Sequence, residues 1–131
     1  MPEPRPMRPE GPVRPRAVGL RRVNCVGESK FQDALVAVAG GKQPQSQYIE
    51  TNAEVRREPG NVHDTNALQV WIAGRLVAYI PRDEAAVYAP AMDAVAMASL
   101  PCAAEIRGGW KDGSDEGSFG VVVGLPWPGK P

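Results

Sequence analysis

The stretch ALQVWIAGRLVAYI, residues 67–80, decides the fold class of this chain. Residues 67–72 and residues 75–80 each alternate in side-chain character as a half-buried β-strand does. Ala73-Gly74 between them fits the two-residue turn of a hairpin. The middle of the chain is therefore expected to be an antiparallel β-hairpin.

The segments on either side of this hairpin mostly predict further short strands. We expect them at residues 22–27, 53–58, 103–110 and 118–124, with a polar loop at residues 111–117. A short helix is expected at residues 32–39, and a second helical region at residues 83–98, which Pro90 divides into two helices or kinks. The expected fold class is mainly β with short helices (α+β), a small six-stranded antiparallel OB-like β-barrel with two helical insertions.

Composition predicts one domain between two tails. The chain has 131 residues and 43% hydrophobic content, enough for a packed core, which we place at residues 23–124. Residues 1–22 are predicted to be a disordered Pro/Arg-rich tail, and residues 125–131 a Pro/Gly-rich C-terminal tail. No apolar segment approaches the roughly 20 residues of a membrane span, and no signal peptide is evident, so a cytoplasmic location without a membrane partner is expected.

Charge is unevenly distributed along the chain. Residues 1–22 carry six arginines and two glutamates, a net charge of +4, whereas the remainder carries nine Lys/Arg and thirteen Asp/Glu, a net charge of −4. Proteins that coat the phosphate backbone usually have a basic domain. Nucleic-acid binding by the folded part is therefore expected to be confined to a local pocket.

Few residues are suited to metal binding or catalysis. Cys25, Cys102 and the one histidine, His63, cannot supply the four ligands of a usual structural zinc site, so both cysteines are expected to be reduced, packed thiols. His63-Asp64 beside Glu58 is a weak nuclease candidate, because catalytic metals usually have three or more converging ligands. We expect no catalysis, metal, cofactor or small-molecule substrate.

The loop that precedes the hairpin has strong turn chemistry. Pro59-Gly60 suits the centre of a type II turn, and Asn61, Asp64 and Asn66 can each hydrogen-bond their own backbone. The hairpin ends in Tyr79-Ile80-Pro81-Arg82 at the entry to the second helical region. We expect the loop and the hairpin exit to lie near each other on one rim.

These residues carry a family resemblance. Residues 57–93, REPGNVHDTNALQVWIAGRLVAYIPRDEAAVYAPAMD, are similar to the signature of the HIRAN domain, with its Asn-x-x-Asp-x-Asn-Ala core at residues 61–67. Residues 26–31, VGESKF, resemble the family's opening strand and the residues after it. The resemblance implies an OB-like barrel that captures the 3′ end of single-stranded DNA, as in DNA repair, with a DNA-processing enzyme as a candidate partner.

The resemblance also implies roles for particular residues. Asn61 and Asp64 match positions that contact the terminal nucleotide and its 3′-hydroxyl, and His63 takes the place of a tyrosine that stacks on a base. A second stacking position falls at Phe31 or its neighbour Lys30. Tyr79 and Arg82 match residues that approach phosphate, and Arg57 is a candidate phosphate contact beside Arg56.

Plainer interpretations stand beside these roles. Asp64 and Asn66 can simply cap the turn, Phe31 can belong to the core, and Arg56-Arg57 can be a solvated strand face. For Trp71, packing is favoured over base stacking. The alternative function is a peptide- or protein-interaction module that uses the barrel groove or a strand edge.

Overall fold

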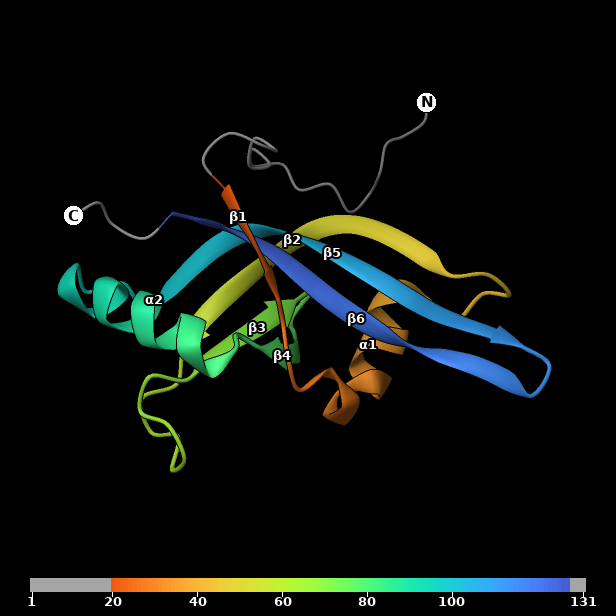
Figure 1. Ribbon diagram of the computed structural model, residues 1–131, viewed down its shortest axis with the longest axis horizontal. Helices are drawn as coiled ribbons and strands as arrows, with labels where there is room; N and C mark the ends of the chain where they lie inside the picture. Colours follow the sequence, from red (N-terminus) through yellow and green to blue (C-terminus); the bar gives the residue numbers. More distant parts are fainter. Residues whose placement is uncertain (1–19, 128–131) are drawn as a thin grey trace.

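The computed structural model describes residues 20–127, which form a six-stranded sheet with two α-helices and one short 3-10 helix (Figure 1). The mainly β class is confirmed. In chain order the elements are β1 (Leu20–Asn24), η1 (Glu28–Lys30), α1 (Gln32–Ala39), β2 (Gln47–Arg57), β3 (Leu68–Ile72), β4 (Arg75–Tyr79), α2 (Arg82–Ala94), β5 (Ser99–Asp112) and β6 (Asp115–Pro126).

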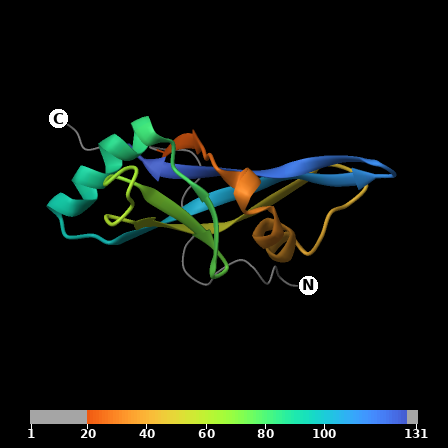
Figure 2. The same cartoon turned by 90° about the horizontal axis from the view of Figure 1, so that it is seen from below.

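The sheet is antiparallel throughout, with the strand order β1-β6-β5-β2-β3-β4. The three longest strands, β2, β5 and β6, have 11, 14 and 12 residues and are neighbours in the sheet. Figures 1 and 2 show β5 and β6 extending together beyond α1 as a two-stranded ribbon. The short hairpin of β3 and β4 pairs with the last residues of β2, from Glu54 to Arg57.

The expected barrel is not confirmed, because the sheet is open. Its edge strands are β1 and β4, which meet only at an isolated bridge between Val26, just after β1, and Tyr79. Two backbone hydrogen bonds of 2.8 Å each join these two residues. One bridge brings the edges together without forming the continuous ladder of a closed barrel.

Alternation along the strands builds the core. In β3, Leu68, Val70 and Ile72 are at most 1% exposed, whereas Gln69 and Trp71 on the other face are half-buried. No polar or charged residue among those described is buried. The helices add one buried residue from α1 and four from α2: Leu35, Ala85, Tyr88, Ala89 and Met92.

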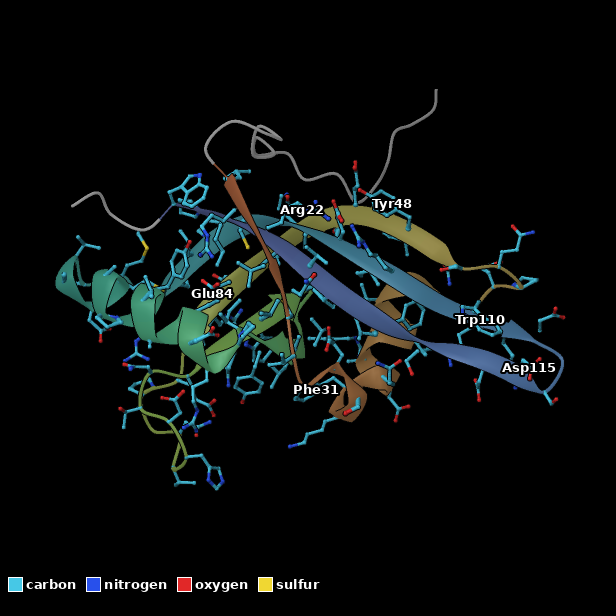
Figure 3. All side chains as sticks on the ribbon, in the orientation of Figure 1. Arg22, Phe31, Tyr48, Glu84, Trp110 and Asp115 are labelled. Atoms are coloured by element: carbon cyan, nitrogen blue, oxygen red, sulfur yellow. The ribbon has the colours of Figure 1, made fainter. Side chains whose placement is uncertain are left out.

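The second helix, α2, continues through Pro90 as one element. Of the two expected alternatives, two short helices or one kinked helix, the first is wrong, because a proline removes only one hydrogen bond and the packing of α2 outweighs that loss. The Tyr88 hydroxyl donates to the carbonyl oxygen of Pro126 at 2.6 Å, and Arg21 pairs with Glu84 at 2.6 Å. Figure 3 shows Glu84 on the side of α2 that faces β1.

Other boundaries also differ from expectation. β2 begins at Gln47 rather than residue 53, and β5 and β6 run through most of the expected loop at residues 111–117. β1 begins at Leu20, within the segment assigned to the N-terminal tail, while the tail predictions for residues 1–19 and 128–131 lie outside the described residues.

Cys25 and Cys102 are buried thiols rather than a disulfide, and burial raises the pKa of Cys25.

Candidate nucleic-acid interface

The loop between β2 and β3, residues 58–67, is held by its own hydrogen bonds. Asn61 Oδ1 accepts the backbone N–H of His63 at 2.8 Å and of Asp64 at 3.0 Å. Asp64 Oδ1 accepts the N–H of Asn66 at 2.9 Å, and the N–H of Ala67 donates to the Asp64 carbonyl. Asn61 and Asp64 thus hydrogen-bond the backbone of their own loop as expected and fix it in one shape, whereas Asn66 takes part through its backbone N–H.

The start of α2 docks onto this loop through Arg82. Arg82 Nη2 donates to the carbonyl oxygen of His63 at 2.9 Å, and Arg82 Nε lies 3.7 Å from Asp64 Oδ2. The Arg82 side chain is nonetheless 71% exposed, and that of Asp64 is 20% exposed. A solvent-facing cation thus lies directly beside a carboxylate. His63 is exposed, and its recorded hydrogen bonds are made by its backbone.

Tyr79, at the end of β4, reaches the same loop from the sheet. Its hydroxyl donates to Glu58 Oε1 at 2.8 Å, and Asn61 Nδ2 donates to the same oxygen at 3.1 Å. Hydrogen bonds from Asn61 and Tyr79 hold the pKa of Glu58 below its usual value. Partial burial and the Glu58 carboxylate raise the pKa of Tyr79, so its hydroxyl stays a hydrogen-bond donor.

Phe31 joins the site through Tyr79. The two ring centroids are 6.2 Å apart with planes inclined by 34°, within the range of favourable aromatic pairs. Gln32 anchors this segment, because its side chain accepts the N–H of Phe119 at 2.9 Å and donates to the Phe119 carbonyl at 3.0 Å. Figure 3 shows Phe31 just beyond the end of β1, beside the helical segments η1 and α1.

We call this set of contacting residues the rim. It consists of Phe31, Glu58, Asn61, His63, Asp64, Tyr79 and Arg82, and it contains six of the eight residues that the sequence singled out. Glu58, which the sequence pointed to only beside a weak nuclease candidate, joins the rim by accepting hydrogen bonds from Asn61 and Tyr79.

The two remaining residues lie outside the rim. Lys30 is exposed at the end of η1. The guanidinium of Arg57, only 10% exposed, pairs with Asp93 of α2 at 2.9 Å and donates to the carbonyls of Thr65 and Ala67 at 3.0 and 3.3 Å. Arg57 is thus placed as a brace behind the loop.

A second group of polar side chains lies at the other end of β2. Glu105 accepts hydrogen bonds from Arg22, Tyr48 and Arg107, and Figure 3 shows Arg22 and Tyr48 on this part of the sheet. These bonds, that from Arg22 above all, lower the pKa of Glu105 to about 2. Every polar atom of the carboxylate is engaged, so we assign this group to stability.

Searches of the described residues add two findings. Residues 20–127 contain no group of three or more His, Cys, Asp or Glu placed to hold a metal ion. Across the same range, every helix is too short or too polar to cross a membrane.

Comparison of the chain with protein-family models, with curated proteins and with solved structures finds no match.

Proposed function

We propose that the rim binds the free 3′ end of single-stranded DNA, and that the chain is a non-catalytic module of the HIRAN type. One observation carries this proposal. Arg82 contacts both His63 and Asp64 of the loop, while Tyr79 joins the same loop to the sheet and to Phe31. A cation, a carboxylate and two aromatic rings therefore meet on one surface, although they come from separate parts of the sequence.

The charged pair supplies the two contacts that a terminal nucleotide needs. Arg82 is mostly exposed and can donate to a phosphate oxygen. Asp64 Oδ2 lies 3.7 Å from Arg82 Nε, beyond hydrogen-bond length, so it retains acceptor capacity for a ligand hydroxyl. A carboxylate accepts from a hydroxyl but repels phosphate, so Asp64 favours a free end over an internal linkage.

The aromatic pair supplies affinity without dependence on sequence. Base–aromatic stacking contributes about 1–3 kcal/mol per base. Tyr79 and Phe31 are both half-buried, so part of each side chain is accessible. The bridge between Val26 and Tyr79 supports an OB-like arrangement for this proposal, because it brings the two sheet edges together beside the rim.

Asp64→Asn tests this mechanism without removing the loop's own support. An asparagine retains an oxygen that can accept the N–H of Asn66, but it lacks the charge. A hydrogen bond to a charged group contributes about 1.5–3 kcal/mol, so we expect about 10- to 150-fold weaker binding of an oligonucleotide with a free 3′-hydroxyl. Binding of the 3′-phosphorylated oligonucleotide should be unchanged or tighter, because the repelling charge is gone.

Fluorescence anisotropy with both oligonucleotides measures these effects, and Asp83→Asn is the matched control. Asp83 lies beside Arg82, and its carboxylate accepts the N–H of Glu84, so the control removes one nearby charge without altering the loop. A folded Asp64→Asn protein that binds both oligonucleotides as the parent does would refute end recognition. Binding of a peptide in place of either oligonucleotide would favour the interaction-module alternative.

A further inference from the structure

A strip of side chains runs across the outward face of β2, β3 and β4 and ends at the rim. The strand register places Arg56 opposite Gln69, and Gln69 opposite Tyr79, so these three lie in one row. Glu54 is opposite Trp71 in the adjacent row. Side chains two residues apart share a face, so Glu58 of the rim continues the line of Glu54 and Arg56.

Contacts within this strip hold a tryptophan in a fixed orientation. The Arg56 guanidinium lies over the Trp71 ring, 4.2 Å from its centroid, and Arg56 Nε donates to Glu54 at 2.7 Å. Trp71 Nε1 donates to Gln69 Oε1 at 2.8 Å. We call Glu54, Arg56, Gln69 and Trp71 the platform. These hydrogen bonds join Arg56 to Glu54 and Trp71 to Gln69, while the side chains of Trp71 and Arg56 remain partly exposed.

The platform lies close to the rim. Tyr79 and Gln69 are on neighbouring strands, about 4.8 Å apart, and Trp71 is two residues further along β3, about 6.7 Å away. Tyr79 and Trp71 are therefore separated by about 8 Å at their backbones. OB folds, whose arrangement the proposed function assigns to this sheet, bind roughly 4–16 nucleotides of a single strand, so a strand held at the rim extends this far.

We propose that a DNA strand whose 3′ end is held at the rim continues over the platform and stacks a base on the Trp71–Arg56 pair. This inference rests on the proposed function of the rim. Aromatic rings and guanidinium planes both stack on bases, and a sheet face that carries them leaves the phosphates toward solvent. Glu54 neutralises Arg56 and would repel a phosphate, so the contact made here is with the base.

If the platform stacks a base, the quenching of Trp71 fluorescence should depend on oligonucleotide length. In a Trp110→Phe, Trp127→Phe protein, Trp71 is the sole tryptophan, and its fluorescence reports stacking directly. A thymidine tetranucleotide with a free 3′ end should quench Trp71, whereas thymidine 5′-monophosphate, which occupies the rim alone, should not. Trp71→Ala should weaken tetranucleotide binding about 5- to 150-fold and leave mononucleotide binding unchanged, and Trp71→Phe should retain most of the affinity.

Salt dependence and a matched variant provide the controls. Because a stacked base releases no counterion, Trp71→Ala should leave the salt slope of binding unchanged. Tyr48→Ala is the control variant: Tyr48 also lies under an arginine, Arg107, at 5.8 Å, but it is eight residues from Arg56 along β2. This change should not affect the tetranucleotide.

Each other outcome has a defined meaning. Equal binding of the mononucleotide and the tetranucleotide, dependent on the 3′-hydroxyl and without quenching, would refute the platform and leave the proposed function intact. Quenching that is identical for blocked and free 3′ ends would show strand binding at the platform and refute end recognition. Quenching by a peptide of residues 2–16, with none by either oligonucleotide, would overturn both proposals.

Discussion

The two consecutive arginines of β2 point to opposite faces of the sheet, and their replacement should separate stability from binding. Arg57 turns inward behind the loop, where it reaches Asp93 and two loop carbonyls. Arg56 turns outward onto Trp71 and is 41% exposed. We expect Arg57→Ala to destabilise the fold and loosen the loop, and Arg56→Ala to weaken binding in a protein of nearly normal stability.

The magnitude for Arg57→Ala follows from the two carbonyl hydrogen bonds. Each has a charged donor but a partly exposed acceptor, so about 1–1.5 kcal/mol each is appropriate, or about 2–3 kcal/mol together. At about 4 °C per kcal/mol for a domain of this size, the melting temperature should fall by roughly 8–12 °C. For Arg56→Ala, the loss of a partly exposed cation–π contact costs about 0.5–1 kcal/mol, or roughly 2–4 °C.

Thermal melting measures the first effect, and the salt dependence of oligonucleotide binding distinguishes a brace from a phosphate contact. Loss of a phosphate contact lowers the salt slope by about one, whereas loss of a brace weakens binding at an unchanged slope. The reasoning about Arg57 fails if Arg57→Ala melts within 3 °C of the parent while its salt slope falls by about one. Arg57 would then be the phosphate contact that the sequence first indicated.

Two further predictions concern the rest of the sheet. Arg22 and its neighbours hold the pKa of Glu105 at about 2. The free energy of unfolding of the parent, measured by urea denaturation, should therefore fall by about 1–2 kcal/mol more than that of Glu105→Gln as the pH falls from about 4.5 to 2. Gly109→Ala places a methyl group in the Phe119 ring at a positive φ and should lower the free energy of unfolding by about 2–4 kcal/mol. Gly113→Ala, where nothing lies within 4 Å of the new methyl group, should lower it by about 1 kcal/mol. Similar melting temperatures of the two variants would contradict this prediction.

The local fold was predictable where the sequence has a short period. The hairpin of β3 and β4 follows from alternation on both sides of Ala73-Gly74, and its bounds agree with expectation within one residue. The length of β2 was not predictable, because residues 47–52 are mostly polar and alternate only weakly. They become a strand by pairing with β5, from Gln47–Gly108 to Asn52–Ala103. Long-range pairing of this kind overrides local propensity.

The sequence predicted most of the residues that meet at the rim but not the contacts that each of them makes. The motif from Asn61 to Ala67 identified the loop, and the chain order placed Tyr79 and Arg82 near it. Which of two adjacent arginines faces outward from the sheet depends on strand register, since a shift of one residue exchanges the faces. The pairing of Arg57 with Leu68 and of Arg56 with Gln69 settles that question for β2. The proximity of Trp71 to Arg56 follows from the same register.

Within the rim, the side-chain oxygens that accept backbone N–H groups of the loop differ from the atoms left accessible to a ligand. Both Asn61 Oδ1 and Asp64 Oδ1 are occupied by backbone N–H groups, so the loop is ordered before any ligand arrives. Ordering a loop on binding costs roughly 1–2 kcal/mol per residue in backbone entropy, and a preformed loop avoids that cost. Under the proposed function, Asp64 Oδ2 and the exposed Arg82 guanidinium can then contribute their full interaction to binding. Under the proposed function, a domain with no net basic charge can hold a single nucleotide with few charges, provided that the loop is rigid, and Arg57 braces this loop against Asp93 of α2.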